Sequence, residues 1–153
     1  MHAHTQRKNR ERGFTLLLAV LVSSLILAIG LAISNILLKE LLLSSSGRES
    51  QFAFYAADSG AECALFWDIK ASAFSTSTAT AISCNAMSLG DVGGQGYDVA
   101  STFTLDFAPE PYCAKVSVTK STNPDRTNIE SRGYNTCDTT NPRRVERAIK
   151  VRY

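Results

Sequence analysis

A stretch of 25 residues without a charged side chain, from Phe14 to Leu38, constrains this chain more than any other feature. As an α-helix rising about 1.5 Å per residue, it is longer than the hydrocarbon core of a bilayer, about 30 Å. The preceding residues 1–13 are basic, which predicts that they stay in the cytoplasm while the rest of the chain is exported. Four basic residues stand against Glu11 in that leader: Arg7, Lys8, Arg10 and Arg12.

Two other interpretations of the apolar segment compete with a processed membrane helix. A secretory signal peptide has an apolar core of about 7–15 residues that ends in small residues at a cleavage site. Here the run is longer, and Lys39-Glu40-Leu41-Leu42-Leu43 continues a helical pattern, which disfavours a signal peptide. A permanently uncleaved single-pass anchor fits the same length and stays an alternative.

Composition limits what the exported part does. The 153 residues suffice for an anchor and one modest domain. Without residues 1–13 the chain keeps 12 basic and 13 acidic residues, so nothing favours counterion release from a nucleic acid. Both histidines, His2 and His4, lie in the leader. The exported part therefore lacks the usual general base and imidazole metal ligand, and we predict no enzyme activity and no cofactor.

Four cysteines follow the apolar segment: Cys63, Cys84, Cys113 and Cys137. An even number on the exported side of a membrane indicates two disulfides in an oxidising compartment. A zinc site with four thiolates is the alternative. Structural zinc sites normally have paired Cys-x-x-Cys ligands, and the wide spacing here disfavours them, so no metal site is predicted.

The helix is predicted to span residues 14–70 and to leave the membrane at about residue 38. Gly30, Ser34-Asn35 and Ser44-Ser45-Ser46-Gly47 are weak points, and the last of these could break the helix. Beyond it, one face suited to cover by a sheet is formed by Phe52, Ala56, Gly60, Cys63 and Trp67.

Two further features of this helix have a structural explanation. Trp67 is better explained as a core residue than as a ligand platform. Asp58 and Glu62 are four residues apart, and with no partner motif nearby they indicate a solvated or intersubunit face rather than a catalytic pair.

Residues 71–96 are rich in small polar residues and are predicted to be a loop, whose Gly93-Gly94-Gln95-Gly96 lacks the context of a phosphate-binding loop. Residues 97–153 are predicted to form an antiparallel sheet. The first strand alternates apolar and polar residues and is closed by Pro109 and Pro111. Its apolar side is expected to hold Tyr97, Val99, Phe103, Leu105 and Phe107.

A hairpin is predicted around Ser121-Thr122-Asn123-Pro124-Asp125-Arg126. A turn centred on residues 124–126 would place Cys113 opposite Cys137 and Lys120 opposite Glu130, giving a disulfide and an ion pair. That register favours the pairing Cys113–Cys137, which leaves Cys63 for Cys84.

The last strand places Val145, Ile149, Val151 and Tyr153 on one face and Glu146, Lys150 and Arg152 on the other. Arg147 interrupts the apolar face, and it either reaches the helix carboxylates or lies at the sheet edge. The predicted fold is thus α+β: a long N-terminal helix, transmembrane in its first half, with a small antiparallel sheet packed on its second half.

The segment Arg12-Gly13-Phe14-Thr15-Leu16-Leu17 resembles the prepilin cleavage and methylation motif of type IV pilins and type II secretion pseudopilins. In that family the prepilin peptidase cuts the bond that corresponds to Gly13–Phe14 on the cytoplasmic face. The new phenylalanine amine is then N-methylated, and the helix becomes the core of a filament. The resemblance implies that Gly13 and Phe14 form the processing site.

Two further segments are similar to PilX-type minor pilins. The stretch from Gln51 to Leu65 resembles their alanine-rich helix with an acidic residue and a glycine, and Ile129-Glu130-Ser131-Arg132-Gly133 with Arg143-Arg144-Val145-Glu146-Arg147 resembles their last two strands. The resemblance covers both ends of the chain and leaves residues 71–111 largely unmatched.

Leu18 departs from the family pattern, because most pilins have glutamate at the fifth position of the mature chain. A carboxylate in the bilayer is costly unless it is paired, and the amine of a neighbouring subunit is its available partner. A subunit at the filament tip has no neighbour above it and gains nothing from that glutamate. Minor pilins and pseudopilins of the tip type share this loss, whereas simple sequence drift is the alternative.

The resemblance implies a minor type IV pilin that serves adhesion, motility or DNA uptake. It would be inserted in the inner membrane and then displayed on the cell surface, with Phe14 and Leu18 in the assembly contact. Its partners would be the prepilin peptidase, other pilin subunits, the inner-membrane assembly machinery and the membrane, and no specific nucleic acid or small-molecule ligand is identifiable. The alternatives are a type II secretion pseudopilin, a permanently anchored binding protein and, least favoured, an exported enzyme.

Overall fold

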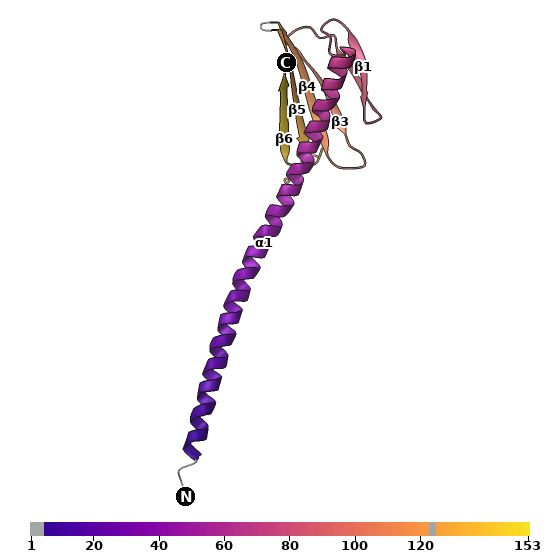
Figure 1. Cartoon of the computed structure of the whole chain (residues 1–153). Coiled ribbons are helices and arrows are strands. Elements are labelled where there is room, and N and C mark those ends of the chain that lie inside the picture. Colours follow the sequence, from indigo (N-terminus) through magenta and orange to yellow (C-terminus); the bar gives the residue numbers. More distant parts are fainter. Residues whose placement is uncertain (1–4, 123–124) are drawn as a thin grey trace. The chain divides into compact units, whose positions relative to one another are not determined.

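The computed structural model describes the backbone of residues 5–122 and 125–153, and the side chains from Phe14 onward within those ranges. One helix precedes six strands, which confirms the predicted α+β fold (Figure 1). Two compact units are present, Met1–Ser45, which we name the apolar unit, and Ser46–Tyr153, the disulfide-bonded unit. The elements are α1 (Thr5–Ala71), β1 (Ala79–Cys84), β2 (Met87–Gly93), β3 (Ala100–Asp106), β4 (Cys113–Thr122), β5 (Asp125–Tyr134) and β6 (Glu146–Arg152).

Helix α1 extends beyond the predicted limits at both ends. It includes residues 5–13 of the predicted leader and ends at Ala71, one residue later than expected. The cluster at residues 44–47 does not break it, because each weak helix former costs only about 1 kcal/mol within a continuous ladder of hydrogen bonds. Ser72 ends the helix with a left-handed backbone, φ 49°, and the Ala73 amide closes the last turn on the Trp67 carbonyl at 3.1 Å.

The predicted loop at residues 71–96 was wrong, because this region contains the antiparallel hairpin β1–β2. Its two-residue turn, Asn85-Ala86, has φ values of 52° and 58°, the type I′ conformation that suits a twisted hairpin. Small polar residues have little intrinsic preference for strands, so tertiary contacts determine that this segment forms a hairpin. Ile82 and Val92 supply them, each 2% exposed in the core.

Strands β3, β4, β5 and β6 form one antiparallel sheet in that order. The alternation predicted for β3 is confirmed by Phe103 and Leu105, which are buried, while β3 itself begins only at Ala100. Tyr97 and Val99 were wrongly placed in this strand and are exposed, because Asp98 between them has a left-handed backbone with φ 60°.

The predicted register of the β4–β5 hairpin was wrong. Cys113 lies opposite Tyr134 and Lys120 opposite Thr127, so the strands pair three residues earlier than expected, around residues 123 and 124, which lie outside the described part of the chain. An odd shift moves side chains to the other face of a strand. Lys120 and Glu130 therefore lie on opposite faces, and the ion pair predicted between them does not form.

Both disulfides join the cysteines that the sequence favoured. Cys63 of α1 is bonded to Cys84 at the end of β1, with Cα atoms 6.2 Å apart. Cys113 at the start of β4 is bonded to Cys137, with Cα atoms 5.7 Å apart. The second bond is not the cross-strand link expected, because Cys137 lies beyond the end of β5. All four cysteines are consumed, which leaves no thiolate for a zinc site in this structure.

Within the disulfide-bonded unit, α1 packs on the sheet through residues with little or no side chain. Gly60 of the helix and Gly133 of β5 mark the closest approach. A Cβ atom at Gly60 would lie 2.5 Å from the Ser131 hydroxyl, and one at Gly133 would overlap the helix backbone at Ala53 and Ala57. Alanines complete this surface and are at most 3% exposed: Ala53, Ala56, Ala57, Ala61 and Ala64. Small residues thus let helix and sheet backbones come close together.

Candidate functional site

The predicted processing bond, Gly13–Phe14, lies within helical backbone of α1. Phe14 is the first residue whose side chain is described, and it is 68% exposed. The side chains of residues 5–13, and His2 and His4 altogether, lie outside the described part of the chain.

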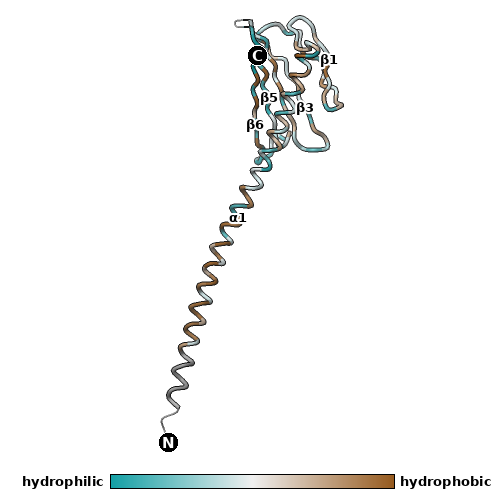
Figure 2. The backbone as a smooth tube through the Cα atoms, in the orientation of Figure 1, coloured by the Kyte–Doolittle hydropathy of each residue, from teal (hydrophilic) through white to brown (hydrophobic). Residues whose placement is uncertain are grey.

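The apolar unit is apolar on every side. Large hydrophobic side chains from Phe14 to Leu43 are all between 46% and 73% exposed, and Figure 2 shows this part of α1 as a largely brown tube. One window of α1 reaches a mean hydropathy of 2.9, and α1 is long and apolar enough to cross a membrane. Ser23 and Ser24 donate their hydroxyl hydrogens to the carbonyls of Ala19 and Leu21, so neither needs water as an acceptor.

Leu18 lies four residues after Phe14 and therefore on the same helix face. It is 51% exposed and surrounded along the helix by leucine and valine, with no charged side chain as far as Lys39. This face offers only apolar surface to whatever covers it. A carboxylate at residue 18 would be the single charge on it.

The second half of α1 has two unlike faces. The predicted sheet-facing side is confirmed by Ala56, Gly60 and Cys63, which are buried, and Phe52 and Trp67 are partly buried at its margins. Trp67 packs on the core and donates its indole hydrogen to the Ser83 carbonyl at 2.9 Å, so it is a structural residue. The opposite face leaves apolar side chains 47% to 64% exposed: Phe54, Tyr55, Phe66 and Ile69.

Asp58 and Glu62 are exposed on that opposite face. Neither forms an ion pair with any residue of the described ranges. Their position agrees with a solvated or intersubunit face, where the like-charge spacing costs little.

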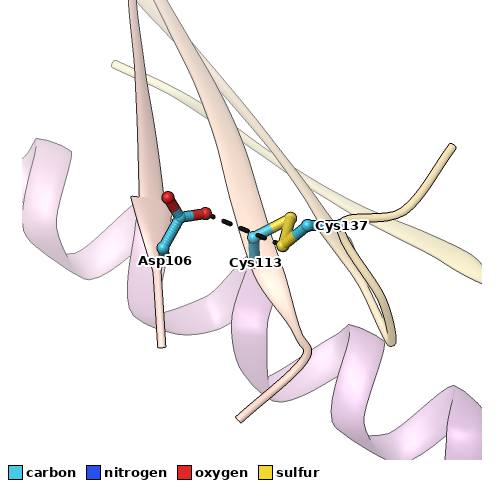
Figure 3. Close-up of side chains that lie close together, drawn as sticks. All are labelled: Asp106, Cys113 and Cys137. Carbon is cyan, nitrogen blue, oxygen red and sulfur yellow. Dashed lines mark hydrogen bonds between the residues drawn. A yellow bond between two sulfur atoms is a disulfide. The ribbon is translucent and has the colours of Figure 1, made fainter. Parts of the chain in front are cut away.

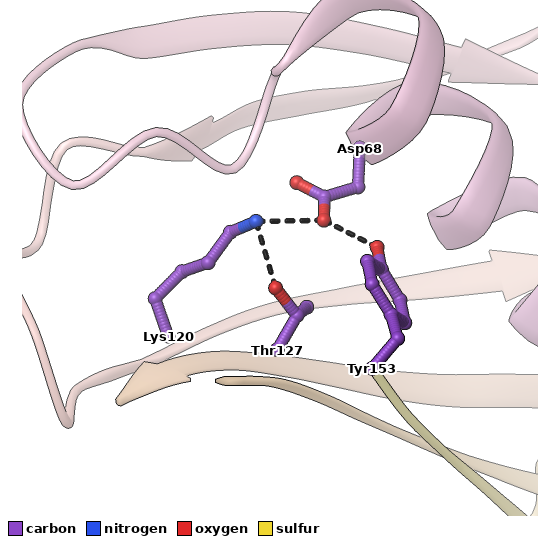
Figure 4. Close-up of polar contacts among 4 residues, drawn as sticks. All are labelled: Asp68, Lys120, Thr127 and Tyr153. Carbon is purple, nitrogen blue, oxygen red and sulfur yellow. Dashed lines mark hydrogen bonds and ion pairs between the residues drawn. The ribbon is translucent and has the colours of Figure 1, made fainter. Parts of the chain in front are cut away.

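A buried ion pair, which sequence reasoning missed, ties the end of α1 to the sheet (Figure 4). The Lys120 ammonium group donates to Asp68 Oδ2 at 2.7 Å and to the Thr127 hydroxyl at 2.9 Å. The Tyr153 hydroxyl donates to the same Asp68 oxygen. The Asp68 side chain is only 3% exposed, against 26% for Lys120. Asp68 is a carboxylate on an otherwise apolar helix face, and this could have indicated a buried ion pair. The predicted β4–β5 register instead gave Lys120 to Glu130.

Tyr153 is held neutral by this cluster. Half of the residue is exposed, while its hydroxyl points at the buried carboxylate. Burial first, and then the hydrogen bond to Asp68, raise the pKa of Tyr153 well above its ordinary value of 10.0. Such a group stabilises the fold fully below pH 10, and the contribution is lost as pH rises through the folded-state pKa.

Glu130, which was expected to pair with Lys120, instead lies on the outer face of the sheet between two other cations. Arg132 approaches it at 2.6 Å and Lys150 at 3.2 Å. The hydrogen bonds from Arg132 and then Lys150 lower the pKa of Glu130. Its contribution to stability is thus present above the ordinary carboxyl pKa and lost as pH falls through the folded-state value. All three side chains keep contact with water, so this contribution is small.

Arg147 does not reach the helix carboxylates. It lies on the helix-facing side of β6, and its Nε donates to the Ser50 hydroxyl of α1 at 2.8 Å. β6 is the last strand of the sheet order, so the alternative that placed this arginine at the sheet edge is confirmed and the alternative that paired it with the helix carboxylates is wrong. Its partner is a hydroxyl rather than a carboxylate.

Asp106 of β3 lies beside the disulfide of Cys113 and Cys137 (Figure 3). A carboxylate oxygen of Asp106 and the sulfur atoms of Cys113 and Cys137 lie within 4.8 Å of one another, a spacing that would suit a metal ion. The contact of Asp106 Oδ1 with the Cys137 sulfur, at 3.6 Å, is van der Waals in nature, because a disulfide sulfur has no hydrogen to donate. Metal ions bind cysteine as a thiolate, and the sulfurs of a disulfide are not thiolates. We therefore interpret this group as a disulfide with a carboxylate beside it and not as a metal site.

No protein-family model, curated protein or solved structure matches the chain.

Proposed function

We propose that this protein is a minor type IV pilin, a structural subunit that is processed by prepilin peptidase at Gly13–Phe14 and assembled at the tip of a cell-surface filament. The observation that carries the proposal is the segment that starts at Phe14. It is charge-free to Leu38, helical, exposed on all sides, and preceded by a basic stretch with a glycine at its end. A helix of this kind needs lipid, or other apolar helices, around it.

The two environments that a pilin meets in turn both satisfy this helix. Before assembly the bilayer covers the apolar unit, and the basic leader keeps residues 1–13 in the cytoplasm. After cleavage the helices of neighbouring subunits replace the lipid. The disulfide-bonded unit has its own exposed apolar side chains on α1, Phe54, Tyr55, Phe66 and Ile69, and other subunits would cover them in the same assembly.

The disulfide-bonded unit is then the exported part. Its two disulfides suit an oxidising compartment, and they tie α1 to β1 and β4 to the segment after β5. The partners implied are prepilin peptidase, the inner-membrane assembly machinery and other pilin subunits.

Leu18 supports a position at the tip. In a filament whose subunits are drawn together by a carboxylate and a neighbour's terminal amine, the first subunit has no such neighbour above it. A carboxylate in the bilayer costs about 3 kcal/mol without a partner. Leucine avoids that cost in a subunit that starts assembly.

Processing is tested by co-expressing the full chain with prepilin peptidase and measuring its intact mass. We expect the chain to lose residues 1–13 and gain one methyl group on the Phe14 amine. A Gly13→Leu variant is the matched control and should stay uncleaved, because the larger side chain disturbs the residue before the cut while the apolar segment is unchanged. A wild-type chain that keeps its full mass would refute the pilin assignment.

The tip position is tested with Leu18→Glu. Restoring the charge lets the subunit sit beneath another one, so we expect fewer filaments per cell by electron microscopy and tagged subunit along the shaft. Leu17→Glu places the same charge on another helix face, and it should reduce membrane insertion without moving subunits into the shaft. Unchanged filament initiation in Leu18→Glu would argue against the tip.

A further inference from the structure

The face of the β3–β6 sheet that points away from α1 is polar and open to solvent. The face toward α1 carries Phe103, Val116 and Ile129, which are at most 6% exposed. Successive side chains of a strand point to opposite faces, so the neighbours of these residues belong to the outer face. On β3, β4 and β5 these neighbours are polar and at least partly exposed: Thr102, Thr104, Lys115, Ser117, Glu130 and Arg132.

Two depressions lie side by side on this outer face. One, of about 540 Å³, is lined by residues of β3, β4 and β5, and the other, of about 160 Å³, by residues of β5 and β6. Glu130 lines both, so together they extend over all four strands, and we name them together the outer groove. The larger depression has the size of a ligand site, since such sites measure about 300–1,000 Å³.

The outer groove is basic within a unit that is almost neutral. The disulfide-bonded unit holds 12 acidic and 11 basic residues. Among the described residues that line the groove, Glu130 is the single acid, and it stands against four cations: Lys115, Arg132, Lys150 and Arg152. This local excess of positive charge favours an anionic ligand.

The placement of the cations also points to an anion. Lys115 lies directly opposite Arg132 in the β4–β5 register, and like charges in that position destabilise a strand pair. Glu130 and Glu146 compensate Arg132. No ion pair among the described residues includes Lys115 or Arg152. A carboxylate bound in the groove would supply the partner that these two cations lack.

Hydroxyl groups surround Lys115 and extend the site beyond a simple anion site. Thr104 lies opposite Lys115 on β3, and Ser117 follows on β4 with Thr102 opposite it. A hydroxyl group both donates and accepts hydrogen bonds, which suits the hydroxyl groups of a sugar. Neighbouring strands are about 4.8 Å apart, close to the length of one sugar residue in an extended chain. A saccharide that crosses the strands therefore places about one sugar over each strand.

We propose that the outer groove binds an extended acidic polysaccharide, a polyuronate, that runs across the strands from β3 to β6. Its carboxylates pair with Lys115 and Arg152, and its hydroxyl groups donate hydrogen bonds to the Glu130 carboxylate. The inference goes beyond the proposed function, because it assigns a ligand to the disulfide-bonded unit. It depends neither on processing at Gly13 nor on a position in a filament.

A polyuronate fits the outer groove better than a nucleic acid does. Single strands are held largely by stacking on aromatic side chains, and Phe103, the aromatic residue among the described lining, is only 6% exposed. A duplex presents closely spaced phosphates, which accept hydrogen bonds but donate none. Glu130 at the centre of the groove would repel them. A uronate chain brings hydroxyl donors as well as carboxylates, so it satisfies both the cations and Glu130.

The test measures binding of a fluorescently labelled oligogalacturonate to the full chain in neutral detergent, by fluorescence anisotropy at about 50 mM salt. Lys115→Gln with Arg152→Gln removes two cations of the groove that have no ion pair in the described chain. Lys70→Gln with Arg143→Gln is the matched control. It removes the same charge from exposed residues outside the groove lining.

We expect wild type to bind the oligogalacturonate and not a neutral maltooligosaccharide of equal length. The groove variant should bind at least about tenfold more weakly, because two charge-assisted hydrogen bonds are lost, whereas the control variant should bind as wild type does. Binding should also weaken at about 500 mM salt, where charges are screened over a shorter distance. Fluorescence of Trp67, the single tryptophan, verifies that each variant is folded.

A third variant, Thr104→Val with Ser117→Ala, separates a saccharide from a polyanion held by charge alone. It removes two hydroxyl groups and no charge, so we expect it to weaken oligogalacturonate binding about threefold or more.

Any of three results would overturn the proposal. The first is equal binding by the groove variant and the control variant. The second is binding that the hydroxyl variant leaves unchanged. The third is a wild type that binds labelled duplex DNA through Lys115 and Arg152 more tightly than it binds the oligogalacturonate. These measurements use the unprocessed chain, so their failure and a failure of the pilin assignment, which is read from intact mass, are distinguishable.

Discussion

Replacing Gly133 with alanine is expected to lower the unfolding temperature of the disulfide-bonded unit by about 15 °C, equivalent to about 3 kcal/mol. The added Cβ would overlap the Ala53 carbonyl and the Ala57 amide, and it would lie 2.9 Å from Ala57 Cα. These are backbone atoms of a continuous helix, which no rotamer change can move aside. Helix and sheet would therefore have to separate along the whole alanine face.

Thermal unfolding followed by Trp67 fluorescence measures this loss, because the side chain of Trp67 in α1 contacts Ser83 of β1. Gly47→Ala is the matched control, because nothing lies within 4 Å of a Cβ there and alanine is the better helix former by up to about 1 kcal/mol. Gly60→Ala should fall between the two, since a Cβ there meets the ends of the Ser131 and Val116 side chains, which have some freedom to move. A Gly133→Ala chain that unfolds at the wild-type temperature would contradict the packing described.

Asp68→Asn is expected to cost about 3 kcal/mol of stability. The substitution keeps the size of the side chain and removes the charge that compensates Lys120 in a site where the Asp68 side chain is only 3% exposed. Lys120 is a quarter exposed, so part of its charge can turn toward water and the loss stays at the lower end of the range for buried pairs. Chemical denaturation with Trp67 fluorescence gives the free energy of unfolding.

Glu130→Gln is the matched control for this pair. Glu130→Gln removes two ion pairs and Asp68→Asn removes one. The two cations beside Glu130 are at least half exposed, so we expect Glu130→Gln to lower the free energy of unfolding by less than about 1 kcal/mol. Adding Lys120→Met to Asp68→Asn should recover most of the lost stability, because no buried charge then lacks a partner. Equal costs for Asp68→Asn and Glu130→Gln would show that burial does not govern these pairs.

The same substitution has a second readout at alkaline pH. The hydrogen bond to Asp68 helps to raise the pKa of Tyr153, so removing the carboxylate should bring the ionisation of this tyrosine back toward pH 10. Tyrosinate absorbance measures it, with Tyr153→Phe to identify the signal. An unchanged titration in Asp68→Asn would show that burial alone sets this pKa.

Much of the fold was predictable because its signals are local. The apolar run, the helical spacing of small residues and the period-two alternation at Phe103 and Leu105 each depend on a few neighbouring side chains. The hairpin β1–β2 was missed because its strands consist mainly of small polar residues, among which Ile82 and Val92 are the buried hydrophobic side chains. Its turn, Asn85-Ala86, also lacks the glycine that makes such a turn visible in a sequence.

The disulfide pairs show how a correct result followed from a wrong register. Cys113 and Cys137 were placed opposite each other in a hairpin, whereas Cys137 lies past the end of β5 and reaches Cys113 from the following segment. Four cysteines allow few pairings, and a short sequence separation favours bonding within one region of the fold. Lys120 and its partner Asp68 are far apart in the sequence, and the wrong register led to the prediction of Glu130 instead.

The sequence by itself determined the division of this protein into a basic N-terminal stretch, an apolar helix and a disulfide-bonded unit with an α+β fold. Charge, hydropathy and spacing are properties of adjacent residues, and they act before any tertiary contact forms. Only the tertiary structure decided that Asp68 pairs with Lys120 and that Gly133 lies against the helix backbone. These depend on strand register and on the closeness of two backbones, which residues far apart in the chain set together.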